Sequence, residues 1–225
     1  MRIEFLAATA LAFALVCGPV SAQDRPQIAW NVGVANDYVF RGYSQTNGNA
    51  QVFGGVDATL GNFYAGSWAS NVDFGDGTDV EVDLYGGHSS EIEGFKVDFG
   101  FAGYLYPSQP DGSDYNYVEL KADISRAIGP VSLGTSLSWS PDYFGVDRSA
   151  TYVEANAAFA LADSWKVSGA VGHQVTDVSG DYSTWNLGVE YNLTKTALID
   201  VRYSDTDRHD PLAGGRAVAS LKFDF

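Results

Sequence analysis

The chain ends in Leu221-Lys-Phe-Asp-Phe225, and this short segment indicates the fold of the whole protein. Alternate residues of a strand point to opposite faces, so Phe225, Phe223 and Leu221 share one face while Asp224 and Lys222 share the other. A strand that is oily on one side and ends on an aromatic residue is typical of the last strand of a bacterial outer-membrane β-barrel. We expect Leu221, Phe223 and Phe225 to form the signal that the barrel-assembly machinery reads. An edge strand of a soluble protein is the alternative.

The other end of the chain has the organisation of a secretory signal peptide. Arg2 supplies a positive charge, residues 5–16 are uncharged and mostly apolar, and Val20-Ser21-Ala22 fits the small-residue cleavage rule. The apolar run of 12 residues is too short to span a bilayer. The sequence therefore predicts a signal peptide at 1–22 and an exported domain at 23–225.

The composition excludes several classes of protein. The chain of 225 residues has 28 acidic and 13 basic side chains, a net charge of −15, which argues against nucleic acid as a partner. Its single cysteine, Cys17, falls in the predicted signal peptide, so no disulfide is expected in the exported domain. Charged residues make up 18%, below the usual ~25%, while aromatic residues reach 14%.

Alternating polar and apolar residues recur along the whole exported domain. This period of two predicts β-strands, and most of the predicted strands have the length that a tilted strand needs to cross a membrane. Twelve strands are expected, at 27–40, 51–60, 63–72, 80–88, 95–106, 115–126, 131–140, 149–160, 165–174, 184–192, 197–207 and 215–225. The predicted fold is all-β, a single transmembrane antiparallel up-and-down β-barrel of about 12 strands.

The connections distinguish a membrane barrel from a soluble one. Long polar loops follow the odd-numbered strands, as in 41–50 and 107–114, and short turns such as Gly61-Asn62 follow most even-numbered strands. Long loops on one rim and tight turns on the other are the pattern of outer-membrane barrels. An even strand count also brings both chain ends to the turn rim. The predicted location is the outer membrane of a Gram-negative bacterium.

Aromatic residues on the oily face should form a girdle at each rim. Those expected near the turn rim are Tyr64, Phe95, Phe159, Trp165, Tyr191 and Phe223. Those expected near the loop rim are Phe40, Trp139, Trp185 and Tyr203. Trp68, in the middle of a strand, does not fit this arrangement.

If the oily face is outside, the opposite face lines the interior. The predicted lumen-lining charged residues are Asp57, Glu81, Asp83, Lys96, Asp98, Glu119, Lys121, Asp123, Glu154, Lys166, Glu190, Asp200, Arg202, Lys222 and Asp224. Acids outnumber bases ten to five in this set. Buried charges need water or ion pairs, so the interior is expected to be either a narrow aqueous channel with some cation preference or a plug of paired charges.

The long loops are rich in aspartate, but their spacing is not that of a metal site. Asp73, Asp76 and Asp79 do not match a calcium loop, so a solvated, repelling surface is expected, with no metal and no cofactor. Four arginines lie near the loop rim and could bind lipopolysaccharide phosphates, although pairs with neighbouring aspartates are favoured: Arg41, Arg148, Arg208 and Arg216.

No catalytic group is expected. A lipid hydrolase built on a barrel would need a serine and a histidine close together on the outer face. His173 has the right face, but Ser140 has the wrong parity and lies two strands away.

Four segments resemble a known family. They are Asn36-Asp-Tyr-Val-Phe-Arg-Gly-Tyr-Ser-Gln-Thr46, Gly54-Gly-Val-Asp57, Phe63-Tyr-Ala-Gly-Ser-Trp-Ala-Ser-Asn-Val-Asp73 and Glu81-Val-Asp-Leu-Tyr-Gly86. They are similar to segments of the TorF-family porins, and the similarity extends over the exported domain. The resemblance implies an outer-membrane barrel with a channel role, and it supplies no catalytic residue and no substrate.

Two functions follow from these observations. The first is a porin-like channel for passive diffusion of small polar or cationic solutes, in contact with outer-membrane lipid and lipopolysaccharide. The second is a non-conducting structural or adhesive barrel whose acidic loops bind an external partner. The oligomeric state is left open.

Overall fold

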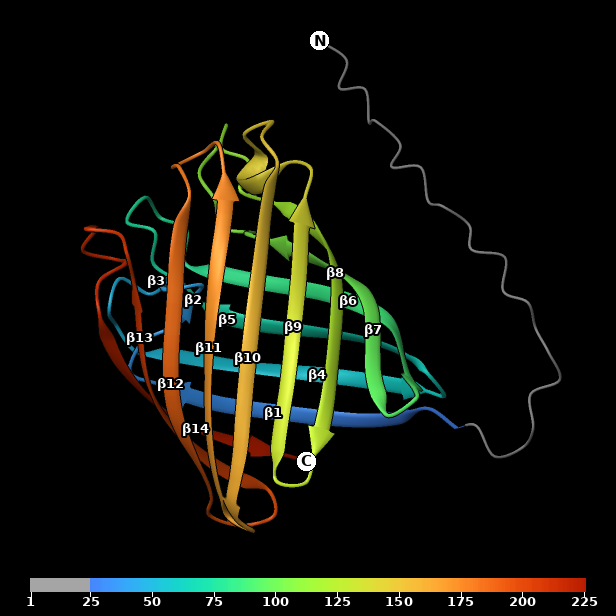
Figure 1. The fold of residues 1–225 in the computed structure, drawn as a ribbon. Coiled ribbons are helices and arrows are strands. Elements are labelled where there is room, and N and C mark those ends of the chain that lie inside the picture. Colours follow the sequence, from blue (N-terminus) through green and yellow to red (C-terminus); the bar gives the residue numbers. More distant parts are fainter. Residues whose placement is uncertain (1–24) are drawn as a thin grey trace, which may run out of the picture.

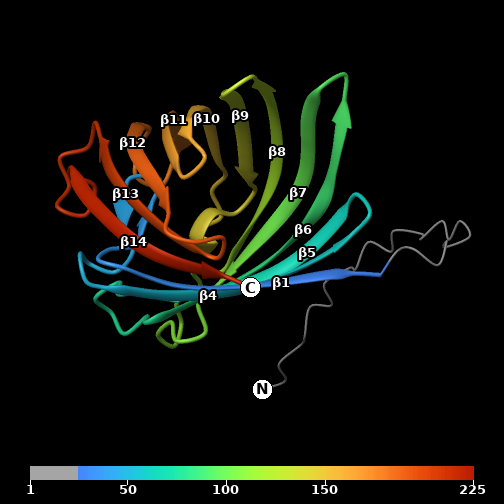
Figure 2. The same cartoon turned by 90° about the horizontal axis from the view of Figure 1, so that it is seen from below.

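The computed structural model describes residues 25–225. The predicted signal peptide and Cys17 lie outside the described residues. Twelve antiparallel strands follow one another round a closed barrel in chain order, and the last pairs with the first (Figure 1, Figure 2). The predicted barrel class and strand count are therefore confirmed.

The barrel strands agree with the predicted ranges to within a few residues, except at the start. They are β1 (Gln27–Ala35), β4 (Gln51–Leu60), β5 (Phe63–Asn71), β6 (Val80–Ile92), β7 (Phe95–Leu105), β8 (Tyr117–Ile128), β9 (Val131–Ser140), β10 (Ala150–Ala162), β11 (Trp165–Thr176), β12 (Tyr182–Asn192), β13 (Ala197–Thr206) and β14 (Arg216–Asp224). Two short strands, β2 (Val39–Phe40) and β3 (Tyr43–Ser44), pair only with each other. A 3-10 helix, η1 (Tyr143–Gly145), lies in the connection between β9 and β10.

The two rims differ as the sequence predicts. At the turn rim, strands are joined by tight connections such as Gly61-Asn62 and Glu93-Gly94, where Gly61 and Gly94 have positive φ angles of 60° and 79°. Glycine adopts this left-handed conformation without the steric cost that a Cβ would impose. The β6–β7 connection is shorter than predicted because β6 continues to Ile92.

The barrel closes where its first and last strands meet. The Trp30 N–H donates to the Phe225 carbonyl at 3.1 Å, and the Phe225 N–H donates to the Trp30 carbonyl at 2.8 Å. Both ends of the described chain therefore lie at the turn rim. In a bilayer this closure is necessary, because an unpaired strand edge would leave backbone groups without hydrogen bonds.

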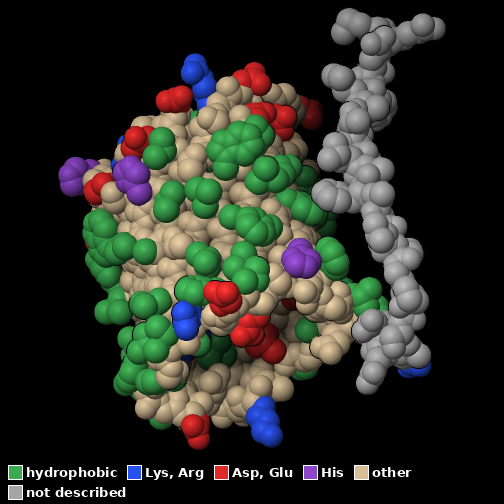
Figure 3. Space-filling model, turned by 45° about the vertical axis from the view of Figure 1, so that its right-hand side comes forward, with side chains coloured by type: hydrophobic (Ala, Val, Ile, Leu, Met, Phe, Trp, Pro, Cys, Tyr) green, Lys and Arg blue, Asp and Glu red, His purple; other side chains and the backbone are tan. Residues whose placement is uncertain are grey.

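Large apolar side chains are exposed on the outer wall of the barrel. Leu187 is 63% exposed, Phe99 62% and Trp30 57%. Figure 3 shows hydrophobic side chains spread over much of the wall, with acidic side chains at the upper end and a second group of them below the centre. Water-soluble proteins rarely expose so much continuous apolar surface, whereas acyl chains would cover it without cost. Among the described residues, no helix is long and apolar enough to cross a membrane.

The prediction was wrong for the first strand. We expected it to run from 27 to 40, but β1 ends at Ala35 and the chain then turns into the interior of the barrel. Tyr38 and Phe40 consequently pack against Trp68 and Tyr104, at ring distances of 5.4 and 5.8 Å. Phe40 is therefore not part of an outer girdle.

Two further aromatic residues point inward. Trp68 contacts Tyr38, which explains why it did not fit the outer face. Tyr64 was expected in the turn-rim girdle, but its hydroxyl donates to Asp98 at 2.7 Å on the inner face. In both cases the neighbouring residues of the strand are small or polar, so the sequence pattern indicates only weakly which side chains face outward.

An aromatic cluster fills the loop end of the barrel beside β6–β8. Its buried members are Val72, Ala102, Tyr104, Tyr106 and Tyr117. Half-buried aromatic rings from the loops pack against it, including Phe74, Tyr143 and Phe144. This cluster narrows the interior on one side, so the cavities of the interior lie on the opposite side and toward the turn rim.

Candidate functional site

The charged residues predicted to line the lumen lie on the face opposite the exposed apolar side chains. The interior of the barrel forms a bore. Nine of these residues line three cavities in the bore, of about 530, 300 and 270 Å³: Asp57, Lys96, Asp98, Lys121, Asp123, Glu154, Lys166, Glu190 and Arg202. Glu81 and Glu119 are instead fully buried nearer the loop rim. That any of them meets a passing solute stays a prediction.

On the β10–β14 side, acids and bases are paired. Lys166 lies 2.8 Å from Glu190, and Arg202 lies 3.0 Å from Asp200. The Arg202 guanidinium also donates to Asn186 at 2.6 Å and to Ser168 at 3.0 Å. Opposite charges largely cancel along this wall.

On the β4–β8 side, the carboxylates are held by tyrosines. The Tyr85 hydroxyl donates to Asp57 at 2.5 Å, and the Tyr64 hydroxyl donates to Asp98 at 2.7 Å. Among the described residues, neither aspartate has a basic nitrogen within 4.0 Å. A tyrosine hydroxyl is a neutral donor, so it orients a carboxylate without bringing a positive charge to it. This side of the bore, where Lys96 also lines the cavity beside Asp57 and Asp98, is called the acidic wall.

The same pattern continues toward the loop rim. Tyr38 donates its hydroxyl proton to Glu81 at 2.8 Å. One carboxylate oxygen of Asp83 is buried and has no hydrogen-bond partner within the described part of the chain. The acidic wall thus extends from the turn rim almost to the level of the short β2–β3 hairpin.

The β2–β3 hairpin crosses the bore and carries Arg41 at its tip. The Arg41 guanidinium forms a two-point contact with Glu119 at 2.7 and 2.9 Å and donates to Gln174 at 3.3 Å. It also lies over the rings of Phe40 and Tyr152, at 4.7 and 4.4 Å. The Arg41 side chain is 7% exposed and that of Glu119 is 2% exposed.

This ion pair anchors the hairpin strongly. Burial alone would lower the pKa of the Arg41 guanidinium, but the Glu119 carboxylate outweighs burial and raises that pKa, so Arg41 stays charged. Removing one partner of a buried pair costs about 3–5 kcal/mol because the other charge is left uncompensated. We did not foresee this pair, because an arginine and a glutamate 78 positions apart carry no local signal.

A glycine allows the hairpin tip to approach the wall. Arg41 and Gly42 form the two-residue turn and have positive φ angles of 47° and 84°, as a type I′ hairpin turn requires. A Cβ at Gly42 would lie 2.2 Å from the Thr206 methyl group. Only glycine therefore fits at this point of the turn.

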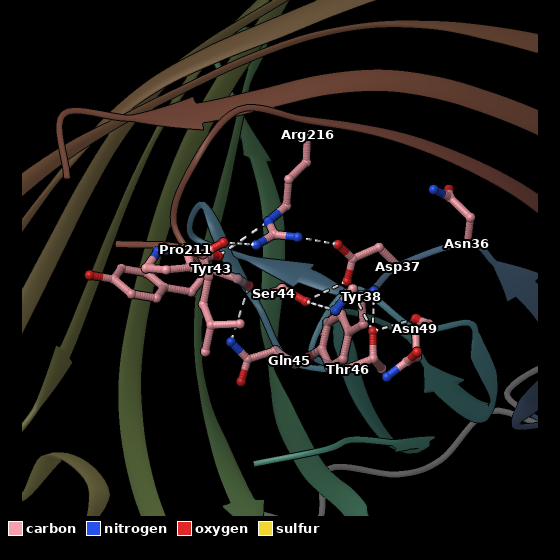
Figure 4. A network of polar contacts seen from close by, with 12 residues as sticks. Asn36, Asp37, Tyr38, Tyr43, Ser44, Gln45, Thr46, Asn49, Pro211 and Arg216 are labelled. Atoms are coloured by element: carbon pink, nitrogen blue, oxygen red, sulfur yellow. Dashed lines mark hydrogen bonds and ion pairs between the residues drawn. The ribbon is translucent and has the colours of Figure 1, made fainter. Parts of the chain in front are cut away.

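Asp37 holds the base of the hairpin in place. Figure 4 shows its carboxylate between Arg216 and the hydroxyl groups of the hairpin. The Ser44 hydroxyl donates to Asp37 at 2.6 Å, and Arg216 contacts the second oxygen at 3.0 Å. The Ser44 N–H donates in addition to the Leu212 carbonyl at 2.8 Å, which joins the hairpin to the last loop.

The hairpin lines a cavity on each of its two sides. The cavity of about 300 Å³ on the turn side is lined by Arg41 and Gly42 together with Lys121, Asp123 and Glu154. A second cavity of about 320 Å³ on the loop side is lined by Tyr43, Ser44 and Gln45 together with residues of four loops. The hairpin is therefore the constriction of the bore.

The loop aspartates bind their own backbone. Asp73 accepts a hydrogen bond from the Gly75 N–H at 3.0 Å, and Asp76 accepts one from the Thr78 N–H at 2.9 Å. The Thr78 N–H and the Tyr115 hydroxyl hold the pKa of the Asp76 carboxyl below its usual value. No group of three or more potential metal ligands occurs within residues 25–225.

Of the four arginines near the loop rim, Arg216 forms the expected pair with an aspartate, Asp37. Arg41 binds a glutamate instead, Glu119 inside the bore. Arg208 donates instead to the carbonyl groups of Ser179 and Gly180 and lies over the Tyr182 ring.

The outer face carries a serine–histidine pair that we did not predict. His173 Nδ1 lies 3.2 Å from Ser183 Oγ, an exposed pair across β11 and β12, rather than near Ser140. A nucleophile of this type needs a third group that orients the histidine. In residues 25–225, no acid is hydrogen-bonded to the histidine ring, so the pair lacks this member.

A family model described as "Bacterial protein of unknown function (Gcw_chp)" matches residues 21–223. The chain belongs to this family. No curated protein matches the chain. The family assignment does not reach the TorF-family porins, so that narrower resemblance stays a prediction.

Solved structures of outer-membrane channels have a similar fold. The KdgM porin in complex with disordered oligogalacturonate has a TM-score of 0.62 at 9% identity, covering 88% of this chain and 98% of KdgM. The NanC porin has a TM-score of 0.61 at 8% identity, covering 88% and 99%. An outer-membrane channel from Pseudomonas putida F1 has a TM-score of 0.58 at 7% identity, covering 88% and 93%. At these identities the similarity establishes the barrel fold.

Proposed function

We propose that this barrel is a channel of the Gram-negative outer membrane that passes small polar or cationic solutes by passive diffusion. The observation that carries the proposal is the acidic wall, where Asp57 and Asp98 are oriented by tyrosines and not by bases. Fixed charges that are not cancelled raise the local concentration of counterions in a pore. The wall therefore favours cations over anions.

The charge of the bore also bears on which solutes this chain would pass. The similar KdgM porin was solved in complex with disordered oligogalacturonate, an acidic oligosaccharide. A polyanion would be repelled by the acidic wall and would find the bases of the opposite wall already paired. We infer that the solutes of this barrel are not acidic oligosaccharides.

Two contacts outside the bore belong to the same proposal. The exposed apolar wall would meet membrane lipid, and the loop rim would lie at the level of lipopolysaccharide. The C-terminal side chains of Leu221, Phe223 and Phe225 would serve as the signal for the assembly machinery. Phe225 is 72% exposed at the seam of the barrel, where such a factor could reach it.

One observation favours the alternative of a non-conducting barrel. The hairpin contacts opposite walls through Glu119, Gln174 and Thr206, and the aromatic cluster fills the neighbouring space. A barrel that stayed closed at this level would act through its loops alone. Electrical measurement on the purified protein separates the two functions.

We expect purified protein in a planar bilayer to give small, discrete currents with a reversal potential of cationic sign in asymmetric KCl. In the double variant Asp57→Asn/Asp98→Asn, the cation-to-anion permeability ratio should fall by about fivefold, because two charges at ~4 Å interact by about 1 kcal/mol in water. Asparagine keeps the oxygen that accepts the tyrosine hydrogen bond, so the wall geometry is retained.

The control is Glu93→Gln, which removes one negative charge from an exposed turn at the same rim. It should leave the permeability ratio almost unchanged. Absence of current, or an anionic reversal potential in the unsubstituted protein, would contradict the proposal.

A further inference from the structure

The loop-side cavity above the hairpin is built largely from aromatic rings. Its volume is about 320 Å³, near the lower end of the ~300–1,000 Å³ that is usual for small-molecule sites. One wall is Tyr43 with Tyr182, whose rings meet edge to face at 5.2 Å. The other wall is formed by Phe74 and Phe144, whose rings lie 6.4 Å apart.

The ring of Phe144 is placed in this wall at a conformational cost. Phe144 has φ 55° and ψ 36°, a left-handed conformation that a bulky residue seldom adopts. The rings of Tyr143 and Tyr117 hold it, at distances of 4.9 and 4.8 Å from the Phe144 ring. Backbone strain of this kind collects at ligand sites, where the surroundings impose it.

The residues that line the cavity carry charge of one sign. Asp73 is the charged side chain among the lining residues, and no lysine or arginine lines the cavity. The connections between the strands at this rim contain twelve aspartates and three arginines, a net charge of −9. Two of these arginines are engaged, since Arg41 binds Glu119 below the cavity and Arg208 lies over the Tyr182 ring at 5.4 Å.

Aromatic faces beside a carboxylate have a defined ligand chemistry. The faces of aromatic rings carry negative potential and attract cations, and cages of such rings bind quaternary ammonium groups. Arg41 over Phe40 and Arg208 over Tyr182 show that rings around this cavity already bind cations of the chain itself. The negative charge of the rim would repel an anion. A neutral sugar would gain no attraction from that charge.

We propose that the cavity bounded by Tyr43, Asp73, Phe74, Phe144 and Tyr182 is an external binding site for a small organic cation whose charge is carried on an apolar body. The ammonium group lies near the Asp73 carboxylate, and the apolar part contacts the rings. The inference does not depend on an open bore, because the cavity lies on the loop side of the hairpin and is reached from outside.

The probe is benzyltrimethylammonium, titrated calorimetrically into the purified full chain in a non-ionic polyoxyethylene detergent. We expect saturable binding of one equivalent, no binding of benzenesulfonate, and no binding of methyl glucoside. Asp73→Asn, which keeps the oxygen that accepts the Gly75 N–H, should weaken binding by about fivefold or more, from the loss of ~1 kcal/mol of charge attraction. Phe74→Leu keeps apolar volume without a ring face and should weaken binding by about two- to fivefold.

Asp111→Asn is the matched control, since it removes a charge from the same rim outside the cavity. Equal weakening by Asp111→Asn and Asp73→Asn would overturn the proposal, because binding would then follow the rim charge alone. Binding of benzenesulfonate or methyl glucoside in place of the cation would also overturn it. The anion and sugar titrations use the unsubstituted protein, so they test the site even if a variant fails to fold.

The site and the channel can fail separately. Binding of the cation without bilayer current would support the site and reject the channel. Bilayer current without binding of the cation would support the channel and reject the site.

Discussion

Replacing residues 39–44 with two glycines should raise the single-channel conductance several-fold. The Gln45 N–H donates to the Tyr38 carbonyl at 2.7 Å, so these two residues already face each other as the ends of a tight turn. A Gly-Gly pair between them adopts the left-handed angles of a two-residue hairpin loop. The change therefore removes the constriction, including β2 and β3, without altering the barrel strands.

The conductance is expected to rise because water and ions gain access to the bore. Without the hairpin, Arg41 no longer lies against Glu119, and water can reach that carboxylate and the cavity of about 300 Å³ below it. Cation preference should rise as well, because Glu119 would lose its neutralising partner. Asp111→Gly, at the tip of another turn of this rim, is the control and should conduct like the unsubstituted protein. A conductance unchanged by removal of the hairpin would show that the constriction lies elsewhere.

Leu187→Arg should destabilise the folded barrel in lipid by about 2–4 kcal/mol, the cost of a basic side chain facing the bilayer midplane. Leu187 lies in the middle of β12 and is 63% exposed on the outer wall. The measurement is the free energy of unfolding in denaturant, taken in lipid vesicles.

Ser136→Arg is the matched control on the inner face. Ser136 stands opposite Asp123 on one neighbouring strand and Glu154 on the other, so a new arginine would find two acids in a wet cavity. We expect it to cost much less than Leu187→Arg. Strand parity alone would suggest Asn186 or Gln174 as controls, but both are unsuitable because they bind Arg202 and Arg41. Equal cost at Leu187 and Ser136 would mean that the two faces are assigned incorrectly.

The barrel could be predicted because its signal is repeated in every strand. Alternation in segments such as Phe95–Leu105 and Tyr182–Asn192 reports directly which face meets lipid and which meets the bore. The difference in connection length then orients the barrel. Where a strand is rich in small residues, as in Phe63–Asn71, the signal is weak, and there Tyr64 was assigned to the wrong face.

The constriction could not be predicted in the same way. Tyr38 and Phe40 continue the alternation of β1, so the pattern extends the first strand by five residues beyond its true end at Ala35. The chain turns inward because of tertiary contacts. Asp37 pairs with Arg216, and Arg41 pairs with Glu119. The Tyr38 hydroxyl donates to Glu81. These partners are far apart in sequence, and only the closed barrel brings them together. The segment at 36–46, which carries part of the predicted resemblance to TorF-family porins, is the one that forms this hairpin.

The central claim is that apolar side chains face acyl chains while polar ones face water inside the barrel. Two consecutive residues of β9 test it most directly: Ser136, which lines the bore, and Leu137, which is 44% exposed on the wall. No cysteine occurs between residues 25 and 225, so Ser136→Cys and Leu137→Cys each introduce a single thiol there. In lipid vesicles, a charged water-soluble thiol reagent should modify Ser136→Cys and leave Leu137→Cys unmodified. Rapid modification of Leu137→Cys with protection of Ser136→Cys would contradict the account.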